Sequence, residues 1–404
     1  MSEVTIQKVM QIGWAAYEKE HPLPGYVRDA IGSILDCRTA KLGGHVQGCP
    51  DGHFKRQWYN SCKHRLCPQC AFIQIERWLD RQKARLLGTD HYHMIFTIPH
   101  ELNELWLGNV RVMSNLLFTA VRDTLFDFMK DEKHVGGLPG IISSLHTWSQ
   151  TLISHIHIHC LITGGGRDDC GRWQRPKRST LLPYRAVMCK FRGKFLARLD
   201  KAIDKGFLEL PEGMSRQRWS NLRNRLGRKV KWNVNVRSRY AHGNGVLVYL
   251  ARYLRGGPMG NHRLVACENG RVKFTYRNNG EGGKKRGVME LPLSQFIQRY
   301  LLHVPVPRSQ AVRYYGLYAP SKRAELGQCR AVLGQLPVGE SEFLTWQDFC
   351  GRQGEEHPEL CPECGKQLVR LEELPAARRK MEPRRRAAWQ PPKFPMTTRR
   401  VVFC

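Results

Sequence analysis

Acidic side chains are scarce in this sequence of 404 residues, which has 35 Asp and Glu against 65 Lys and Arg and a formal net charge of +30. An excess of this size goes beyond what solubility requires and indicates a polyanionic partner, with nucleic acid as the leading class. No apolar run approaches the ~20 residues that span a bilayer, and no basic amphipathic helix stands out. The composition therefore argues against a membrane as the partner and favours DNA or RNA.

Two further signals are missing. Residues 1–11 lack the charged-then-apolar pattern of a secretory signal, so we expect a cytoplasmic protein whose 14 cysteines are thiols or metal ligands and not disulfides. The pattern Gly-x-x-x-x-Gly-Lys-Ser/Thr of nucleotide-driven helicases is absent as well. With 41% hydrophobic residues the chain can nevertheless bury a core, and its length predicts two or three structural units.

The most distinctive stretch is an apolar strand at 155–163 with histidines at alternate positions, closed by three glycines. Alternate side chains of a strand share one face, so His157 and His159 point the same way and can hold one divalent metal. In a preceding strand at 141–148, counting by two places His146 and Gln150 on one face. If this face adjoins that of His157 and His159, His146 or Gln150 is the third ligand. A shift of one residue in the pairing register of the two strands would turn this face away. The alternative is a strand whose histidines are half-buried and hydrogen-bonded.

Two tyrosines, Tyr249 and Tyr253, stand four residues apart in a stretch with helical character. On a helix this spacing stacks them on one face, where they can serve as paired nucleophiles. The alternative is an amphipathic helix that buries both rings. Arg252 and Arg255 beside them are expected to grip phosphates, unless they belong to a solvated helix face.

Each of these motifs is weak evidence by itself, but their order along the chain is specific to one family. A His-hydrophobic-His strand followed by a Tyr-x-x-x-Tyr helix resembles the two-tyrosine HUH nucleases, and over about residues 30–320 the sequence resembles the IS91-family transposases. The matching pieces are Gly43-Gly44-His45, Tyr59-Asn60-Ser61-Cys62, Cys67-Pro68-Gln69-Cys70, Phe96-Thr97-Ile98-Pro99, Leu145-His146-Thr147-Trp148, the His157/His159 strand with Gly164–Gly166, and Tyr249/Tyr253.

The resemblance implies an α+β fold, an HUH-type antiparallel sheet with packed helices preceded by a small zinc-binding domain. It implies a transposase that nicks and transfers single strands in rolling-circle transposition, through tyrosine attack and a 5′-phosphotyrosine intermediate. The implied cofactors are Mg²⁺ or Mn²⁺ on the histidines and Zn²⁺ in the N-terminal domain. The implied partners are single-stranded transposon ends and target DNA, with a host helicase, at the bacterial nucleoid. A further pair, His91 and His93, alternates in an earlier strand that the resemblance assigns to the scaffold.

Two other classes stay open. A rolling-circle replication initiator or relaxase uses the same cleavage chemistry without transposition. The missing helicase motif disfavours an initiator that unwinds DNA by itself, but it does not distinguish a relaxase from a transposase. A zinc-ribbon DNA-binding protein without catalysis would bury the tyrosines and use the histidines structurally.

Residues 37–70 are loop-like and rich in metal ligands. Cys67 and Cys70 form a Cys-x-x-Cys knuckle, whose spacing aims two sulfurs at one tetrahedral zinc ion. We expect Cys49 and His53 as the other half, with an imidazole where the resembled family has a second thiolate. The reserve ligands, which can also complete a second site, are Cys37 and Cys62. Cys361 and Cys364 form another knuckle and a candidate second zinc site, with Cys350 and His357 as partners.

The chain divides into four expected segments: a helical and zinc-binding domain at 1–88, the HUH nuclease domain at 89–285, a C-terminal helical region with the second knuckle at 286–375, and a basic, disordered tail at 376–404. A basic loop within the nuclease domain is expected to contact DNA through Arg167, Arg172 and Arg175.

Overall fold

A five-stranded antiparallel sheet forms the centre of the molecule. The computed structural model describes residues 4–178, 180–240, 244–251, 257–278, 285–338, 345–352 and 357–377. The strand order is β12-β4-β5-β3-β8, so the histidine strand β5 lies in the middle of the sheet. These strands are β3 (His91–Thr97), β4 (Gly140–Trp148), β5 (Ser154–Thr163), β8 (Asn233–Tyr240) and β12 (Val312–Gly316). The α+β class and the antiparallel sheet are thereby confirmed.

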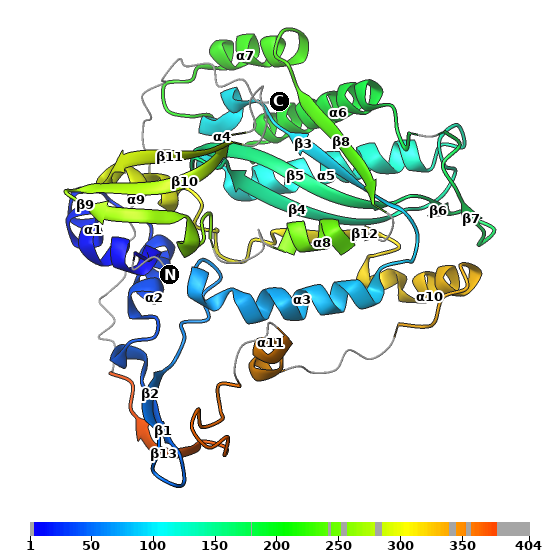
Figure 1. The fold of residues 1–404 in the computed structure, drawn as a ribbon. Helices are drawn as coiled ribbons and strands as arrows, with labels where there is room; N and C mark the ends of the chain where they lie inside the picture. Colours follow the sequence, from blue (N-terminus) through cyan, green and yellow to red (C-terminus); the bar gives the residue numbers. More distant parts are fainter. Residues whose placement is uncertain are drawn as a thin grey trace.

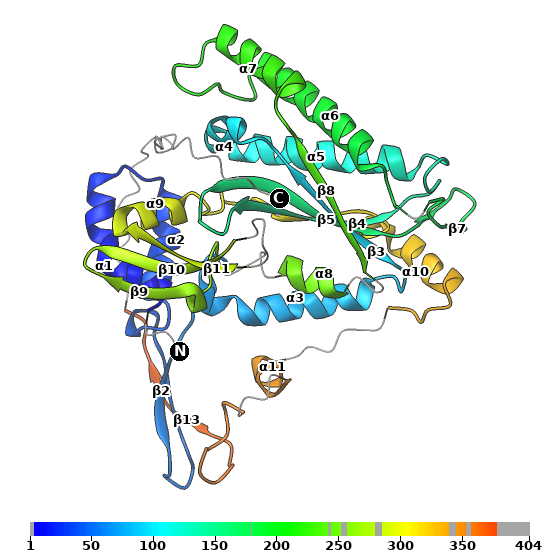
Figure 2. The ribbon, with the colours of Figure 1, turned by 45° about the horizontal axis from the view of Figure 1, so that its top comes forward.

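The two faces of β5 bury different side chains. Ile156, Ile158 and Ile162 point into a large core against α5 (Val110–Met129) and α6 (Tyr184–Asp204). Phe191 and Phe195 of α6 meet the buried Trp232 edge to face in this core. Figure 2 shows these helices on one side of the sheet. Two shorter helices extend the same layer, α4 (Asn103–Gly108) and α7 (Arg216–Arg228).

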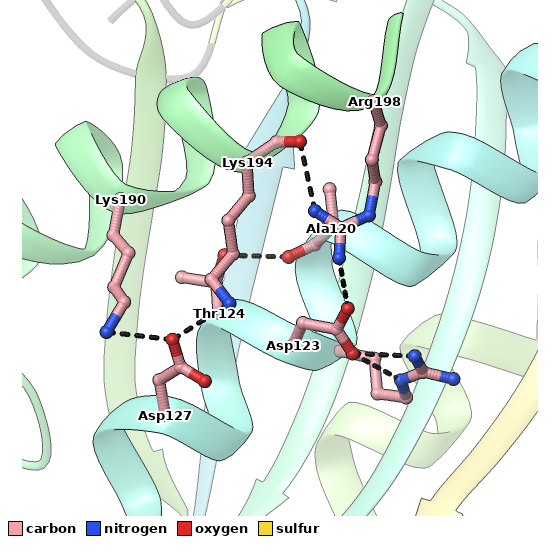
Figure 3. A network of polar contacts seen from close by, with 8 residues as sticks. Ala120, Asp123, Thr124, Asp127, Lys190, Lys194 and Arg198 are labelled. Atoms are coloured by element: carbon pink, nitrogen blue, oxygen red, sulfur yellow. Dashed lines mark hydrogen bonds and ion pairs between the residues drawn. The ribbon is translucent and has the colours of Figure 1, made fainter. Parts of the chain in front are cut away.

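A row of ion pairs lines the outer seam between α5 and α6 (Figure 3). Asp127 lies 2.8 Å from both the Lys190 and the Lys194 ammonium groups, and Asp123 pairs with Arg198. Partly exposed pairs of this kind contribute about 0–1 kcal/mol each. The apolar core below them therefore supplies most of the free energy that holds the two helices together.

The opposite face of the sheet is covered by α3 (Phe72–Arg85) and α8 (Asn244–Ala251), as Figure 2 shows. Val246 and Leu250 of α8 are buried in one cluster with Ile142 of β4 and Leu161 of β5. Leu161 has the same parity along β5 as His157 and His159, so α8 packs on the face of the sheet that carries these histidines. The helix α10 (Arg323–Val332) joins the same layer.

The N-terminal helices α1 (Ile6–Glu20) and α2 (Gly25–Asp36) pack against α9 (Leu293–Leu301), far along the chain. The approach is close, because a Cβ atom on Gly13 would lie 2.6 Å from Cδ1 of Ile297. A three-stranded sheet completes this layer: β9 (Leu264–Glu268), β10 (Arg271–Asn278) and β11 (Lys285–Pro292). β9 and β10 form a hairpin, and Asn269 and Gly270 both have positive φ in its turn.

A narrow arm projects from the body of the molecule (Figure 1). Its β1 (Gly44–Gly48) and β2 (Lys55–Tyr59) form a hairpin, and β13 (Val369–Leu374) pairs with the free edge of β1. The arm thus joins the segment expected at 1–88 to the one expected at 286–375. The short α11 (Trp346–Arg352) and the two-residue strands β6 (Gly166–Arg167) and β7 (Trp173–Gln174) complete the described α-helices and β-strands. None of the described helices combines the length and apolarity of a membrane span.

Candidate metal and nucleophile sites

Three histidines converge on the face of the sheet below α8. His146 of β4 stands directly opposite His157 of β5, and His159 follows two residues later on the same face. One ring nitrogen from each lies within 4.8 Å of those of the other two. Of the two candidates for the third position, His146 belongs to this cluster. β4 ends at Trp148, so counting by two does not extend to Gln150, which lies in the following turn with its carbonyl accepting a hydrogen bond from Arg263.

Hydrogen bonds orient two of these rings. Nδ1 of His157 lies 2.8 Å from the carbonyl oxygen of His155, which can only accept, so Nδ1 carries the proton and Nε2 keeps a lone pair. Nδ1 of His159 lies 2.8 Å from Nε2 of His93 on the neighbouring strand β3. A metal-binding histidine commonly uses its second nitrogen in this way, which fixes the ring and its tautomer.

Burial keeps two of these rings uncharged. Together with the neighbouring histidines, it lowers the pKa of His157 to about 3 and holds the pKa of His146 well below its usual range. A neutral imidazole is the form that binds a metal. Three imidazoles on one face, two of them fixed from behind by hydrogen bonds, fit a divalent cation.

One residue of this site, His93, was missed in the sequence analysis, which assigned its strand to the scaffold. It is buried, 3% exposed, and stands opposite Leu161, so it is the diagonal neighbour of His159 across the β3–β5 ladder. Its alternation with His91 was visible in the sequence. His91 itself bonds to the hydroxyl of Tyr318 at 2.7 Å and not to the cluster.

The tyrosine pair is described only in part. Position 249 lies within α8, the helix that packs on the histidine face. Arg252, Tyr253 and Arg255 lie outside the described residues.

A four-thiol cluster lies at the base of the arm. Cys37 follows α2, Cys62 follows β2, and Cys67 and Cys70 belong to the predicted knuckle. The sulfur of Cys37 lies 3.4 Å from that of Cys70 and 3.7 Å from that of Cys67, and Cys62 lies 3.6 Å from Cys70. Sulfurs bound to one tetrahedral zinc ion are about 3.8 Å apart. The two reserve ligands therefore complete the first site.

These thiols do not ionise independently. Hydrogen bonding, with Cys37 as the strongest partner, lowers the pKa of Cys70 and raises the pKa of Cys67. Four thiolates at this spacing repel one another unless a cation lies between them, and a zinc ion supplies that charge.

The expected pairing of Cys49 and His53 with the first knuckle is wrong. The β1–β2 hairpin carries both residues to its tip, away from the four thiols at its base. There they meet Cys361 and Cys364, so the second knuckle is completed by Cys49 and His53 and not by Cys350 and His357.

The arginines expected in the basic loop have different surroundings. Arg167 donates a hydrogen bond to Gln328 at 3.0 Å, and Arg172 pairs with Asp168 at 3.0 Å. Arg175 is exposed. Arg172 is exposed as well, and its pair with Asp168 closes the turn at Gly171.

Two family models match the chain. "Transposase zinc-binding domain", of the IS91 type, matches residues 9–98, and "Putative transposase" matches residues 140–325. A Sinorhizobium fredii protein named "Putative transposase y4qJ" is 34% identical over 370 residues, 88% of this chain and 92% of the relative. The "Transposase for insertion sequence element IS801" of Pseudomonas savastanoi pv. phaseolicola is 27% identical over 318 residues, 76% of this chain and 73% of the relative. No solved structure matches.

Proposed function

Because the chain belongs to the IS91-family transposases, we propose that it nicks and transfers single DNA strands by tyrosine attack on a scissile phosphate, in rolling-circle transposition. The family makes it a transposase that acts on DNA, with Zn²⁺ bound in its N-terminal domain. One observation carries the finer proposal: His146, His157 and His159 converge on the face of the sheet that the helix containing Tyr249 covers.

The nucleophile is Tyr249 or Tyr253. A phenol with a pKa near ~10 is a weak nucleophile at neutral pH, so its proton must be removed as it attacks. The phenolic oxygen bonds to phosphorus, the bond from phosphorus to the 3′ oxygen breaks, and that oxygen takes up a proton. The products are a 5′-phosphotyrosine and a free 3′-OH, and the retained phosphodiester allows rejoining without ATP. Two tyrosines allow one chain to hold two strand ends.

His146, His157 and His159 would hold Mg²⁺ or Mn²⁺, which when bound polarises the scissile phosphate as a Lewis acid. The three rings contribute neutral donors from a rigid sheet, so the site is fixed before DNA arrives. The proposed phosphate contacts are Arg252, Arg255 and the three arginines of the basic loop, Arg167, Arg172 and Arg175. A host helicase would separate the strands.

The test of the histidine cluster is His157→Ala. We expect cleavage of a single-stranded transposon end to fall roughly a thousandfold, since Lewis-acid catalysis supplies several kcal/mol and each 1.4 kcal/mol is tenfold in rate. DNA affinity should stay within about twofold, because His157 is buried. Single-turnover cleavage at saturating DNA and fluorescence anisotropy measure the two quantities.

The matched control for this variant is His91→Ala, which also removes a buried imidazole from the same sheet but one that bonds to Tyr318. Cleavage should stay within a few fold of the unmodified protein. Equal losses in both variants would mean that the cluster supports the fold and not the reaction.

His93 gives a second, independent prediction. His93→Ala should weaken Mn²⁺ binding about 10- to 100-fold, because removing the group that orients a metal-binding histidine typically costs that much affinity. Calorimetric Mn²⁺ titration without DNA measures this directly, and raised Mn²⁺ should restore cleavage. The His91→Ala protein should bind Mn²⁺ normally. A cleavage defect in His93→Ala that saturating Mn²⁺ leaves unchanged would contradict a positioning role.

A further inference from the structure

The tip of the arm brings together two turns that are far apart in the sequence. Cys49 and His53 lie in the turn between β1 and β2, and Cys361 and Cys364 lie in the turn before β13. The sulfur of Cys49 lies 3.5 Å from that of Cys364, across a sequence separation of 315 residues. The same sulfur lies 3.7 Å from Nδ1 of His53, and all four ligand atoms lie within 4.8 Å of one another.

The two turns are closed by equivalent backbone hydrogen bonds. The N–H of Cys49 donates to the carbonyl of Phe54, and the N–H of Cys361 donates to the carbonyl of Lys366, five residues on in both cases. Each turn needs a glycine in the left-handed region, Gly52 with φ of 80° and Gly365 with φ of 71°. Each turn therefore presents two ligands toward the other.

The chemistry of this donor set selects zinc. Three thiols and one imidazole are a common ligand set for a structural zinc ion, with sulfur-to-sulfur distances of about 3.8 Å and sulfur-to-nitrogen distances of about 3.5 Å. The separations of 3.5 and 3.7 Å fit these values. A disulfide needs about 2.05 Å between sulfurs and would leave one thiol and the imidazole unused.

Apolar burial is too small to hold this tip together. The cluster around the ligands has three buried members, Cys49, Cys361 and Leu368, with Phe54 packed beside them. β13 itself is almost entirely exposed; Leu371 is 54% exposed and Val369 is 42% exposed. The ion pair between Lys366 and Asp51 joins the two turns at 2.7 Å but lies on the surface and contributes little. Short, exposed strands of this kind need an added cross-link.

We propose that Cys49, His53, Cys361 and Cys364 bind a second zinc ion, which clamps the segment 357–374 onto the N-terminal hairpin. Cys361 and Cys364 lie outside both matched family regions, which end at residues 98 and 325. The clamp also fixes residue 376 against the base of the hairpin: a Cβ atom on Gly43 would lie 2.7 Å from the backbone nitrogen of Ala376. The rest of the tail expected at 376–404 lies outside the described residues.

The experiment compares the full chain with the Cys361→Ser/Cys364→Ser variant, and it needs no DNA cleavage. Zinc per chain, measured by mass spectrometry of the metal after dialysis, should be lower by one in the variant. Amide exchange at 369–374 should be slow in the unmodified protein and at least a hundredfold faster in the variant, while exchange in β3 and β5 stays unchanged.

The control is Cys350→Ser, a cysteine in α11 outside the cluster, which should keep both the zinc content and the protection. An unchanged zinc content in the double variant would overturn the site. A loss of one zinc with protection of 369–374 intact would overturn the clamp. Faster exchange throughout β3 and β5 would mean that the double variant is generally misfolded. In that case the proposal stands only if Gly365→Ala, which strains only the second turn, shows the same loss of protection at 369–374.

Discussion

Changing both Tyr249 and Tyr253 to phenylalanine is expected to abolish the covalent protein–DNA adduct and to lower strand cleavage by roughly 10⁵-fold or more. Removal of the nucleophile from a site that acts as a unit leaves only the residual effects of binding and electrostatics, and comparable losses in other enzymes reach about 10⁶-fold. The adduct is measured by denaturing gel and mass spectrometry after incubation with Mn²⁺ and a labelled single-stranded end. Each single variant then identifies the tyrosine that attacks first.

Tyr184→Phe is the control for this prediction, because it removes a hydroxyl from an exposed tyrosine on α6, on the other side of the sheet. Its adduct yield should equal that of the unmodified protein. An adduct that persists in the double variant, or the absence of any adduct with the unmodified protein, would show that another residue attacks or that the reaction is of another kind.

Changing Cys67 to alanine is expected to unfold the base of the arm. Cys67 is 1% exposed and belongs to both the four-thiol cluster and the core that α1, α2 and α9 share. A structural zinc ion contributes about 10–16 kcal/mol of apparent binding free energy, which is as large as the whole free energy of unfolding of a typical domain, about 5–15 kcal/mol. The variant should lose one zinc per chain, melt at a markedly lower temperature and exchange its amides at 37–70 rapidly.

Cys189→Ala, at an exposed cysteine on α6, should change neither zinc content nor melting. Chelation of zinc from the unmodified protein should reproduce the Cys67→Ala behaviour, which separates loss of the metal from loss of a buried side chain. Normal melting together with full zinc content in Cys67→Ala would contradict a structural role for the ion.

Periodicity predicted the centre of the fold well. The strand expected over 155–163 is observed at Ser154–Thr163, and the strand expected over 141–148 at Gly140–Trp148. The histidine face of β5 followed from the two-residue repeat alone, because a central strand buries both faces and its alternation is strict. Which neighbouring residue joins that face depends on strand register, and register is set by pairing between segments that the sequence does not align. This is why His146 stayed one of two candidates. His93 was assigned to the scaffold by the family resemblance, and the pairing of β3 with β5 that brings it to His159 is equally invisible in the sequence.

The zinc ligands show the same limit. Cys-x-x-Cys spacing identified Cys67/Cys70 and Cys361/Cys364 as pairs, since two ligands in one turn are a local property. The partners of each pair are not local. Nearness in sequence favoured Cys49 and His53 for the first knuckle, yet the β1–β2 hairpin carries both residues away from that knuckle by the length of one strand. Nothing in the local pattern indicates that a strand from 369–374 returns to the edge of β1.

The pairing of β13 with β1 also sets an order of events during synthesis. The ligands of the four-thiol cluster all lie between residues 37 and 70, so this cluster can close soon after the first 70 residues leave the ribosome. Cys49 and Cys364 are 315 residues apart, and at about 5–20 residues per second a ribosome needs roughly 15–60 s to cover that distance. During this interval the tip of the nascent hairpin has only half of its ligands. A chain terminated after β12 would contain every strand of the central sheet while its arm stayed open, so closure of the arm reports that translation has passed the second knuckle.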